Sequence, residues 1–108
     1  MKIRLIDICH ARSGDKGDAV NIGVIAYDKK DYPVILKYLT ADKVKQHFKD
    51  ICHGEVKRYE LPNLKALNFV LENSLGGGGS ATLKFDAQGK TFAAAILKME
   101  INTENQEG

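Results

Sequence analysis

Two apolar stretches separated by a short polar segment constrain the fold of this chain most strongly. Residues 2–11 (KIRLIDICHA) begin with alternating apolar and charged side chains and then become apolar on both faces. Residues 19–27 (AVNIGVIAY) are rich in β-branched side chains, which favour strands. The segment Arg12–Asp18 between them is polar and contains glycine. We therefore predict two strands, 2–11 and 19–27, that pair through a loop at Arg12–Asp18.

The middle of the chain predicts two helices. Residues 32–39 suit a short helix because Pro33 fits its first turn, although Val34 and Ile35 also suit a strand. Thr40 is a good N-cap for a second helix, in which apolar side chains recur at 41, 44, 48 and 51 and which Gly54 would end.

The next segment first alternates and then takes a helical spacing. Residues 55–61 alternate like an exposed strand, and a bare strand at a sheet edge is a template for pairing with another chain. Residues 62–75 begin with Pro62 and carry leucines at 64, 67, 71 and 75, the spacing of a buried helical stripe. We predict a strand over 55–61, with association through an exposed edge or face, and then a helix that Gly76 ends.

The C-terminal part predicts a hairpin. Residues 86–89 (DAQG) begin with Asp and end with Gly, as type I turns prefer, and they lie between strand-like stretches at 80–85 and 90–101. We predict that these two stretches are antiparallel neighbours and that the polar tail 102–108 is disordered.

Together these elements predict one α+β domain over residues 1–101. A chain of 108 residues has the size of one domain. Its 44% hydrophobic and 28% charged residues are close to globular averages, which excludes disordered and coiled-coil chains. Strands that are neighbours in sequence favour an antiparallel or mixed sheet. We expect a ferredoxin-like two-layer sandwich of about five strands, with two or three helices on one face.

Charge and cysteine content exclude further classes. A net charge of +2 is too small to hold a nucleic-acid backbone at physiological salt. The chain has neither an apolar run long enough to span a membrane nor a leader pattern. Two cysteines are too few for a disulfide framework and fit a reducing compartment. We expect a cytoplasmic protein with no nucleic-acid or membrane partner.

The pairs Cys9-His10 and Cys52-His53 are weak candidates for zinc ligands. Adjacent strand residues point to opposite faces, so Cys9 and His10 would not converge on one ion, and the sequence has no Cys-x-x-Cys. We predict no metal and no cofactor, and we expect both cysteines to be small buried side chains whose role stays open.

The polar segment after His10 has the chemistry of an anion site. Arg12 offers a planar fork for a carboxylate or phosphate, and Lys16 offers a mobile point charge. Gly14 and Gly17 allow a ligand to approach the backbone closely. If the first strand runs through position 12, His10 and Arg12 share a face.

A second interpretation of the same segment gives it a purely structural role. In it, Asp15, Lys16 and Asp18 neutralise one another in a charged hairpin loop. The run Gly76–Ser80 (GGGGS) also allows a structural and a ligand-binding interpretation. Its four glycines permit a sharp chain reversal, or they let backbone N–H groups bind an anion.

Several segments together resemble one family. They are HARSGDKGDAVNIGVIA at 10–26, LTADKV at 39–44, LPNLKALNFVL at 61–71, LGGGGS at 75–80 and DAQGKT at 86–91. Over residues 3–101 the chain is similar to the carboxy-terminal ferredoxin-like domain of AtuA, the acyclic terpene utilisation proteins. In that family the domain follows a much larger amino-terminal domain, and the longer protein is linked to bacterial catabolism of branched acyclic terpenoid or acyl-CoA compounds.

The resemblance implies a small subunit or accessory domain that docks to a larger AtuA-like subunit and contributes an anion-binding loop to a shared site. The ligand-binding candidates are Arg12, Ser13, Gly14, Lys16, Gly17, Asn21, Gly76, Gly77, Gly78, Gly79 and Ser80. The alternative is a self-sufficient enzyme or ligand-binding module for a carboxylate or CoA-type metabolite, working as a homo-oligomer. Its candidate acid/base residues are His10, Asp15 and Asp18. Substrate, reaction and oligomer number stay open.

Overall fold

The structure is a computed structural model that describes residues 2–16, 19–50, 52–72 and 90–103 of the chain. Its main sheet has four strands in the order β2-β3-β5-β4, and every neighbouring pair is antiparallel. These strands are β2 (Cys9–Lys16), β3 (Ala19–Ala26), β4 (Val56–Leu61) and β5 (Ala66–Leu71). β2 and β4 are therefore the two edges of the sheet.

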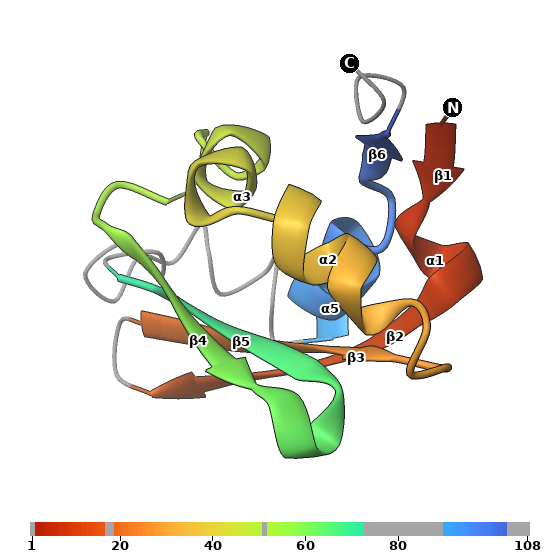
Figure 1. The fold of residues 1–108 in the computed structure, drawn as a ribbon. Helices are drawn as coiled ribbons and strands as arrows, with labels where there is room; N and C mark the ends of the chain where they lie inside the picture. Colours follow the sequence, from red (N-terminus) through yellow and green to blue (C-terminus); the bar gives the residue numbers. More distant parts are fainter. Residues whose placement is uncertain (1, 17–18, 51, 73–89, 104–108) are drawn as a thin grey trace.

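A second, two-stranded sheet joins the two ends of the described chain. β1 (Lys2–Arg4) pairs antiparallel with β6 (Glu100–Asn102), with Ile3 opposite Ile101. Figure 1 shows these short strands side by side, away from the main sheet.

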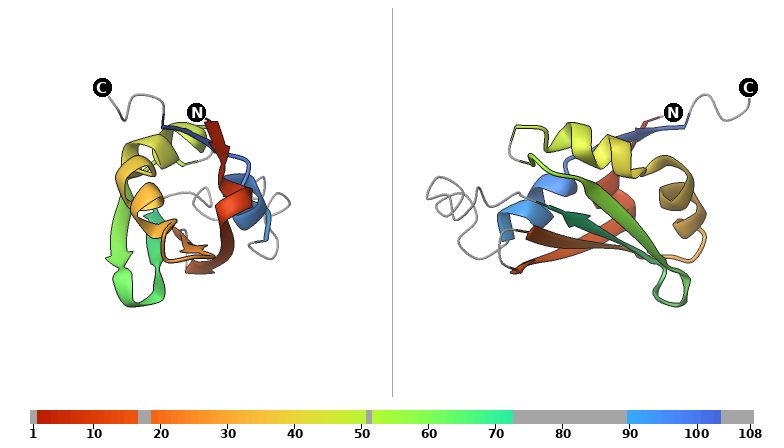
Figure 2. Two further views of the ribbon diagram at one scale, coloured as in Figure 1. Left: turned by 45° about the vertical axis from the view of Figure 1, so that its right-hand side comes forward. Right: turned by 90° about the vertical axis from the view of Figure 1, so that its left-hand side faces the viewer.

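The helices lie on one face of the main sheet (Figures 1 and 2). They are α1 (Leu5–Ile8), α2 (Tyr32–Tyr38), α3 (Ala41–His47) and α5 (Lys90–Ile96), and a 3₁₀ turn at Pro62–Leu64 links β4 to β5. The core fills the space between the two layers. Its buried side chains include Cys9, Val20, Ile22, Val24, Leu67, Phe69 and Leu71 from the sheet and Ile35, Val44, Phe92 and Ile96 from the helices.

The predicted α+β class with helices on one face of a sheet is confirmed, and so are several elements. Residues 19–26 and 56–61 are strands, the latter at a sheet edge, and residues 32–38 are a helix with proline in its first turn. Thr40 caps α3 by accepting a hydrogen bond from the Lys43 N–H at 3.2 Å. The helix ends at His47, before the predicted stop at Gly54.

The predicted N-terminal strand and the loop after it are wrong in their boundaries. One turn of helix, α1, interrupts residues 2–11, and β2 then runs through Arg12 to Lys16. The segment Arg12–Asp18 is thus not a loop over most of its length, because Arg12 pairs with Gly23 and Lys16 with Ala19. β2 is an edge strand, and charged residues are common on edge strands because they discourage pairing with another chain.

The predicted helix over 62–75 is wrong as well. Residues 66–71 form β5 in the interior of the sheet, and Leu64 is exposed in the 3₁₀ turn. Leu67 and Leu71 are four residues apart, a spacing that fits one face of a strand as well as one face of a helix. Phe69 between them is also buried, as a strand requires. Leu75 and Gly76 lie outside the described residues.

The predicted C-terminal hairpin is also wrong, because Lys90–Ile96 is a helix. Three consecutive alanines at 93–95 favour the helix, and Phe92 and Ile96, one turn apart, are both buried. Residues 80–89 lie outside the described residues. Asn102, placed at the start of the predicted tail, ends β6, and residues 104–108 lie outside the described ranges.

Lys65 has a left-handed backbone, with φ 54° and ψ 43°, between the 3₁₀ turn and β5. This conformation costs a residue with a Cβ about 1 to 2 kcal/mol, and glycine adopts it freely. We expect Lys65→Gly to raise the free energy of unfolding by about 1 kcal/mol and Lys65→Val to lower it by about 1 kcal/mol. Urea denaturation of the two variants measures both changes, and the reverse order would contradict the assigned backbone.

Candidate functional site

The face of the main sheet turned away from the helices is the candidate functional surface, and we call it the open face. Within the described residues no helix lies on it (Figure 2). Directly paired residues of antiparallel strands share a face, so the register defines its members. They are His10, Arg12, Gly14, Asn21, Gly23, Ile25, Lys57, Tyr59, Leu61, Ala66, Asn68 and Val70.

Alternation along each strand produces this face. In β3 the even positions from Val20 to Ala26 are buried under the helices, and the odd positions between them are half-buried. In β2, Cys9 is buried whereas His10 and Arg12 are exposed. The condition set for His10 and Arg12 to share a face is met, because β2 runs through position 12, and Cys9 is turned away from them.

One row of residues crosses all four strands of the open face. Arg12 pairs with Gly23, Gly23 with Asn68, and Asn68 with Tyr59. A Cβ at position 23 would lie 3.9 Å from Asn68 Oδ1 and 4.0 Å from the Arg12 carbonyl oxygen. The missing side chain of Gly23 therefore leaves a bare position between the Arg12 and Asn68 side chains.

Arg12 is the cation of this row. Its side chain is exposed, and no described carboxylate forms an ion pair with it. Lys57 differs, because its Nζ lies 3.2 Å from Glu72 Oε2, and the hydrogen bond to that carboxylate raises the pKa of Lys57. Unlike Lys57, Arg12 forms no ion pair with a carboxylate in the part of the chain that the structure describes.

His10 lies beside Arg12 on the same strand. Its ring stacks on Tyr27 with ring centroids 5.3 Å apart and an interplanar angle of 25°. Stacking holds the imidazole against the sheet. The described residues place no carboxylate on His10 to orient it as a general base.

Comparison with protein families assigns the fold. A family model described as the AtuA ferredoxin-like domain matches residues 3–102. The chain belongs to this family. The resemblance drawn from the sequence is thereby confirmed, and so is the ferredoxin-like fold. Neither the comparison with curated proteins nor that with solved structures gives a match.

The AtuA ferredoxin-like domain brings some of the predicted site residues together and separates others. Arg12, Gly14 and Asn21 lie on the open face, with Gly14 opposite Asn21. Ser13 pairs with Ile22 and so lies on the other face of β2. Asp15 and Lys16 are placed by their backbones, opposite Val20 and Ala19. Gly17, Asp18 and the run Gly76–Ser80 lie outside the described residues.

Sequence reasoning missed Tyr59 and Asn68, which complete the row with Arg12 and Gly23. Asn68 was missed because residues 62–75 were assigned to a helix. The signal that could have found it is the polar Asn68 between the apolar Leu67 and Phe69, with Leu71 next on the same face. Among the described residues no group of His, Cys, Asp and Glu has the arrangement of a metal site. None of the helices in the described ranges has the length and apolar character needed to cross a bilayer.

Both cysteines of the domain are buried, as predicted. Cys52 Sγ donates to the carbonyl oxygens of Gly54 and Glu72 at 3.5 and 3.6 Å. Burial, with a smaller contribution from the negative charge of Asp31, raises the pKa of the Cys9 thiol from 9.0 to about 12. A thiol with so high a pKa is a poor nucleophile at neutral pH.

The raised pKa of Cys9 predicts a loss of stability at alkaline pH. Above pH 9.0 the thiol ionises in the unfolded chain, whereas in the folded chain it stays protonated until about pH 12. The unfolded state therefore binds fewer protons in this window, and the free energy of unfolding falls by about 1.4 kcal/mol per pH unit from this group. We expect Cys9→Ala to flatten the decline measured by urea denaturation between these pH values. An unchanged slope would contradict the burial of the thiol.

Proposed function

We propose that this AtuA ferredoxin-like domain works with a larger AtuA-like domain in the catabolism of branched acyclic terpenoid or acyl-CoA compounds. Its open face would dock on the larger domain and contribute Arg12 to a shared anion site. Membership of the family supports the first part of this proposal. The observation that carries the second part is the exposed Arg12, without a described carboxylate partner, beside the bare position of Gly23.

The chemistry of the row suits a carboxylate or phosphate. A guanidinium binds such groups through two parallel N–H bonds, and each charged hydrogen bond contributes about 1.5 to 3 kcal/mol. Asn68 lies on the other side of Gly23, with its acceptor oxygen Oδ1 nearest to the Gly23 position, so its amide would turn over to donate to an anion from Nδ2. Gly23 has no side chain of its own, which would let an anionic group approach the sheet surface beside Ile25 at this point.

The remainder of the open face suits a protein surface. On β4, Tyr59 is 49% exposed and Leu61 is 39% exposed. Half-buried Ile25 on β3 and half-buried Val70 on β5 lie between β4 and the other edge strand, β2. Tyrosine and arginine together with a small apolar area are typical of the centre of protein interfaces. On a larger domain this face would become the wall of a site that the small domain does not enclose by itself.

Anion binding is tested by isothermal titration calorimetry with CoA and with sulfate, on the domain alone and with the larger AtuA-like domain present. We expect Arg12→Ala to weaken CoA binding about ten-fold, because one charged contact is lost. Gly23→Ala fits without a clash and should weaken binding by filling the bare position. Lys45→Ala on α3, an exposed lysine outside the open face, is the matched control. Identical binding by the Arg12 and Lys45 variants would refute the anion site.

Docking is tested separately by co-purification and sedimentation with the larger domain. We expect a complex that Tyr59→Ala and Arg12→Ala weaken and Lys45→Ala leaves intact. A homodimer that forms through the open face and excludes the larger domain would overturn the docking proposal, as would a complex that none of these changes weakens.

A further inference from the structure

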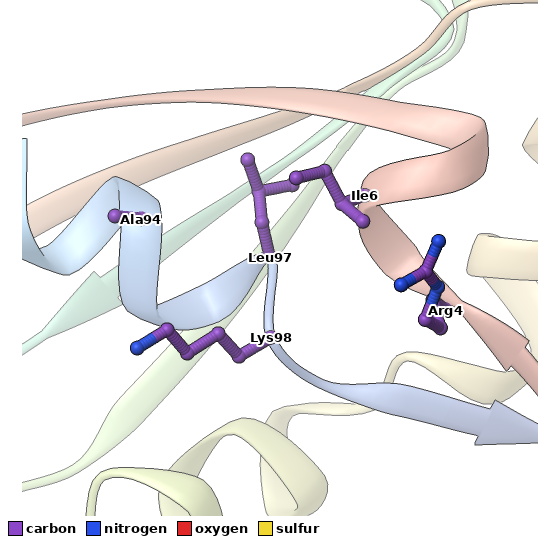
Figure 3. Close-up of a pocket in the computed structure, with 5 residues that line it drawn as sticks. All are labelled: Arg4, Ile6, Ala94, Leu97 and Lys98. Carbon is purple, nitrogen blue, oxygen red and sulfur yellow. The ribbon is translucent and has the colours of Figure 1, made fainter.

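A pocket in the helical layer has the composition of a ligand site and lies away from the open face. It has a volume of about 500 Å³ and is lined by Arg4, Ile6, Ala94, Leu97 and Lys98. This volume falls within the range of small-molecule sites, roughly 300 to 1,000 Å³. Figure 3 shows that one wall comes from the start of α1 and the other from α5 and the residues that follow it.

The floor and walls of the pocket are apolar. Ile6 is 50% exposed although α1 buries its neighbour Leu5 completely. The Ile6 and Leu97 side chains point toward one another in Figure 3, with Ala94 one helical turn before Leu97. Single exposed apolar residues are common on protein surfaces. Exposed Ile6 and Ala94 and half-buried Leu97 instead line one concave site, which an apolar ligand can cover.

The two cations at the rim differ in their partners. Arg4 donates from Nε to Asp7 Oδ2 at 3.0 Å and from Nη2 to Asp7 Oδ1 at 3.1 Å, so Asp7 fixes its orientation and matches its charge. Lys98 is exposed, and no described carboxylate pairs with it. Figure 3 places Arg4 and Lys98 on either side of the apolar side chains.

The two cations that line the pocket differ in net charge balance within the described residues. Arg4 is balanced by Asp7, and nearby Lys2 lies 3.9 Å from Glu100. Lys98 has no ion pair among the described carboxylates, and it stands at the edge of an apolar pocket. A ligand that matches this arrangement has a hydrocarbon body and a single negative charge.

We propose that this pocket binds an aliphatic monocarboxylate. The hydrocarbon chain packs against Ile6, Ala94 and Leu97, and the carboxylate meets the ammonium of Lys98 at the rim. Arg4, whose charge Asp7 matches, borders the opposite side of the pocket. The inference does not depend on the proposed function, because none of these residues belongs to the open face.

Three probes of graded chemistry test the site by amide NMR titration. Octanoate carries both chain and charge, octan-1-ol carries the chain alone, and acetate carries the charge alone. We expect saturable shifts with octanoate at the amides of Ile6, Ala94, Leu97 and Lys98, about five-fold weaker binding of octan-1-ol, and no saturation with acetate. Octanoate shifts that do not saturate, or that map to Asn21 and Asn68 instead, would overturn the proposal.

Variants then separate the charged contact from the apolar one. Lys98→Gln is expected to reduce octanoate affinity about five-fold, to that of octan-1-ol, and to leave octan-1-ol binding unchanged. Lys45→Gln is the matched control, and Ala94→Trp should abolish both by filling the pocket. Arg12→Ala should bind octanoate like the wild type, so that failure of the open-face proposal and failure of this one are distinguishable. Equal octanoate affinity of the Lys98 and Lys45 variants would refute the role of Lys98.

Discussion

Replacing Phe92 with alanine is expected to lower the free energy of unfolding by about 3 to 5 kcal/mol. Phe92 is fully buried on α5, and its ring lies against the Phe48 ring with centroids 5.5 Å apart. Truncation removes a large apolar area and leaves a cavity between α5 and Phe48, the residue that follows α3, where close-packed neighbours cannot collapse fully. Urea denaturation followed by circular dichroism measures the loss.

Tyr59→Ala is the matched aromatic truncation. Tyr59 is 49% exposed on the open face, so its removal should cost less than about 1 kcal/mol. Equal losses for the two variants would mean that Phe92 does not pack as described, and with it the assignment of residues 90–96 to a buried helix would fail.

The second large effect is expected at Arg58, on the helix-facing side of edge strand β4. Its Nη1 donates to the carbonyl oxygens of Leu36 and Leu39, at 2.9 and 3.0 Å, and its side chain is only 20% exposed. These carbonyls belong to the C-terminal end of α2, where helices have no internal donors. We expect Arg58→Leu to lower the free energy of unfolding by about 2 to 3 kcal/mol, because a carbonyl left buried without a partner costs about 1 to 3 kcal/mol.

Two comparisons make the Arg58 experiment specific. Arg58→Lys keeps the charge and one donor and should restore part of the loss. Arg4→Gln breaks the exposed pair with Asp7, whose two side chains are 66% and 51% exposed, and should cost less than about 1 kcal/mol. If Arg58→Leu is as mild as Arg4→Gln, water replaces the arginine at the end of α2 and the capping role is wrong.

The sequence predicts strands and helices well where one periodicity excludes the other. Residues 19–26 alternate over a whole strand and were assigned correctly. The spacing of Leu67 and Leu71 fits both a helix and a strand. The predicted helix is wrong because this segment pairs with β3, where Phe69 lies opposite Ile22. That contact joins segments distant in the chain, and local spacing does not contain it.

The C-terminal error has a different cause. The turn signal at 86–89 favours a hairpin, whereas the alanines at 93–95 favour a helix. Local turn chemistry is compatible with several continuations of the chain. The buried spacing of Phe92 and Ile96 decides in favour of the helix.

For the candidate site, the sequence predicts the residues that lie together on one strand. Alternation puts His10 and Arg12 on one face only if the strand runs through position 12, and β2 meets that condition. Their neighbours Asn68 and Tyr59 come from strands more than forty residues away, as their numbers show. The register between β3, β5 and β4 brings them together, and it depends on packing across the whole sheet.

The pairing of β1 with β6 has a mechanical consequence. Lys2 stands opposite Asn102, so the first and last described strands begin and end at the same point of the domain. A neighbouring domain that pulls on both ends would apply force along the hydrogen bonds between β1 and β6, because antiparallel hydrogen bonds lie perpendicular to the strands. These hydrogen bonds would then break one after another. The pairing of β1 with β6 would therefore separate at low force, while the four-stranded sheet stays folded.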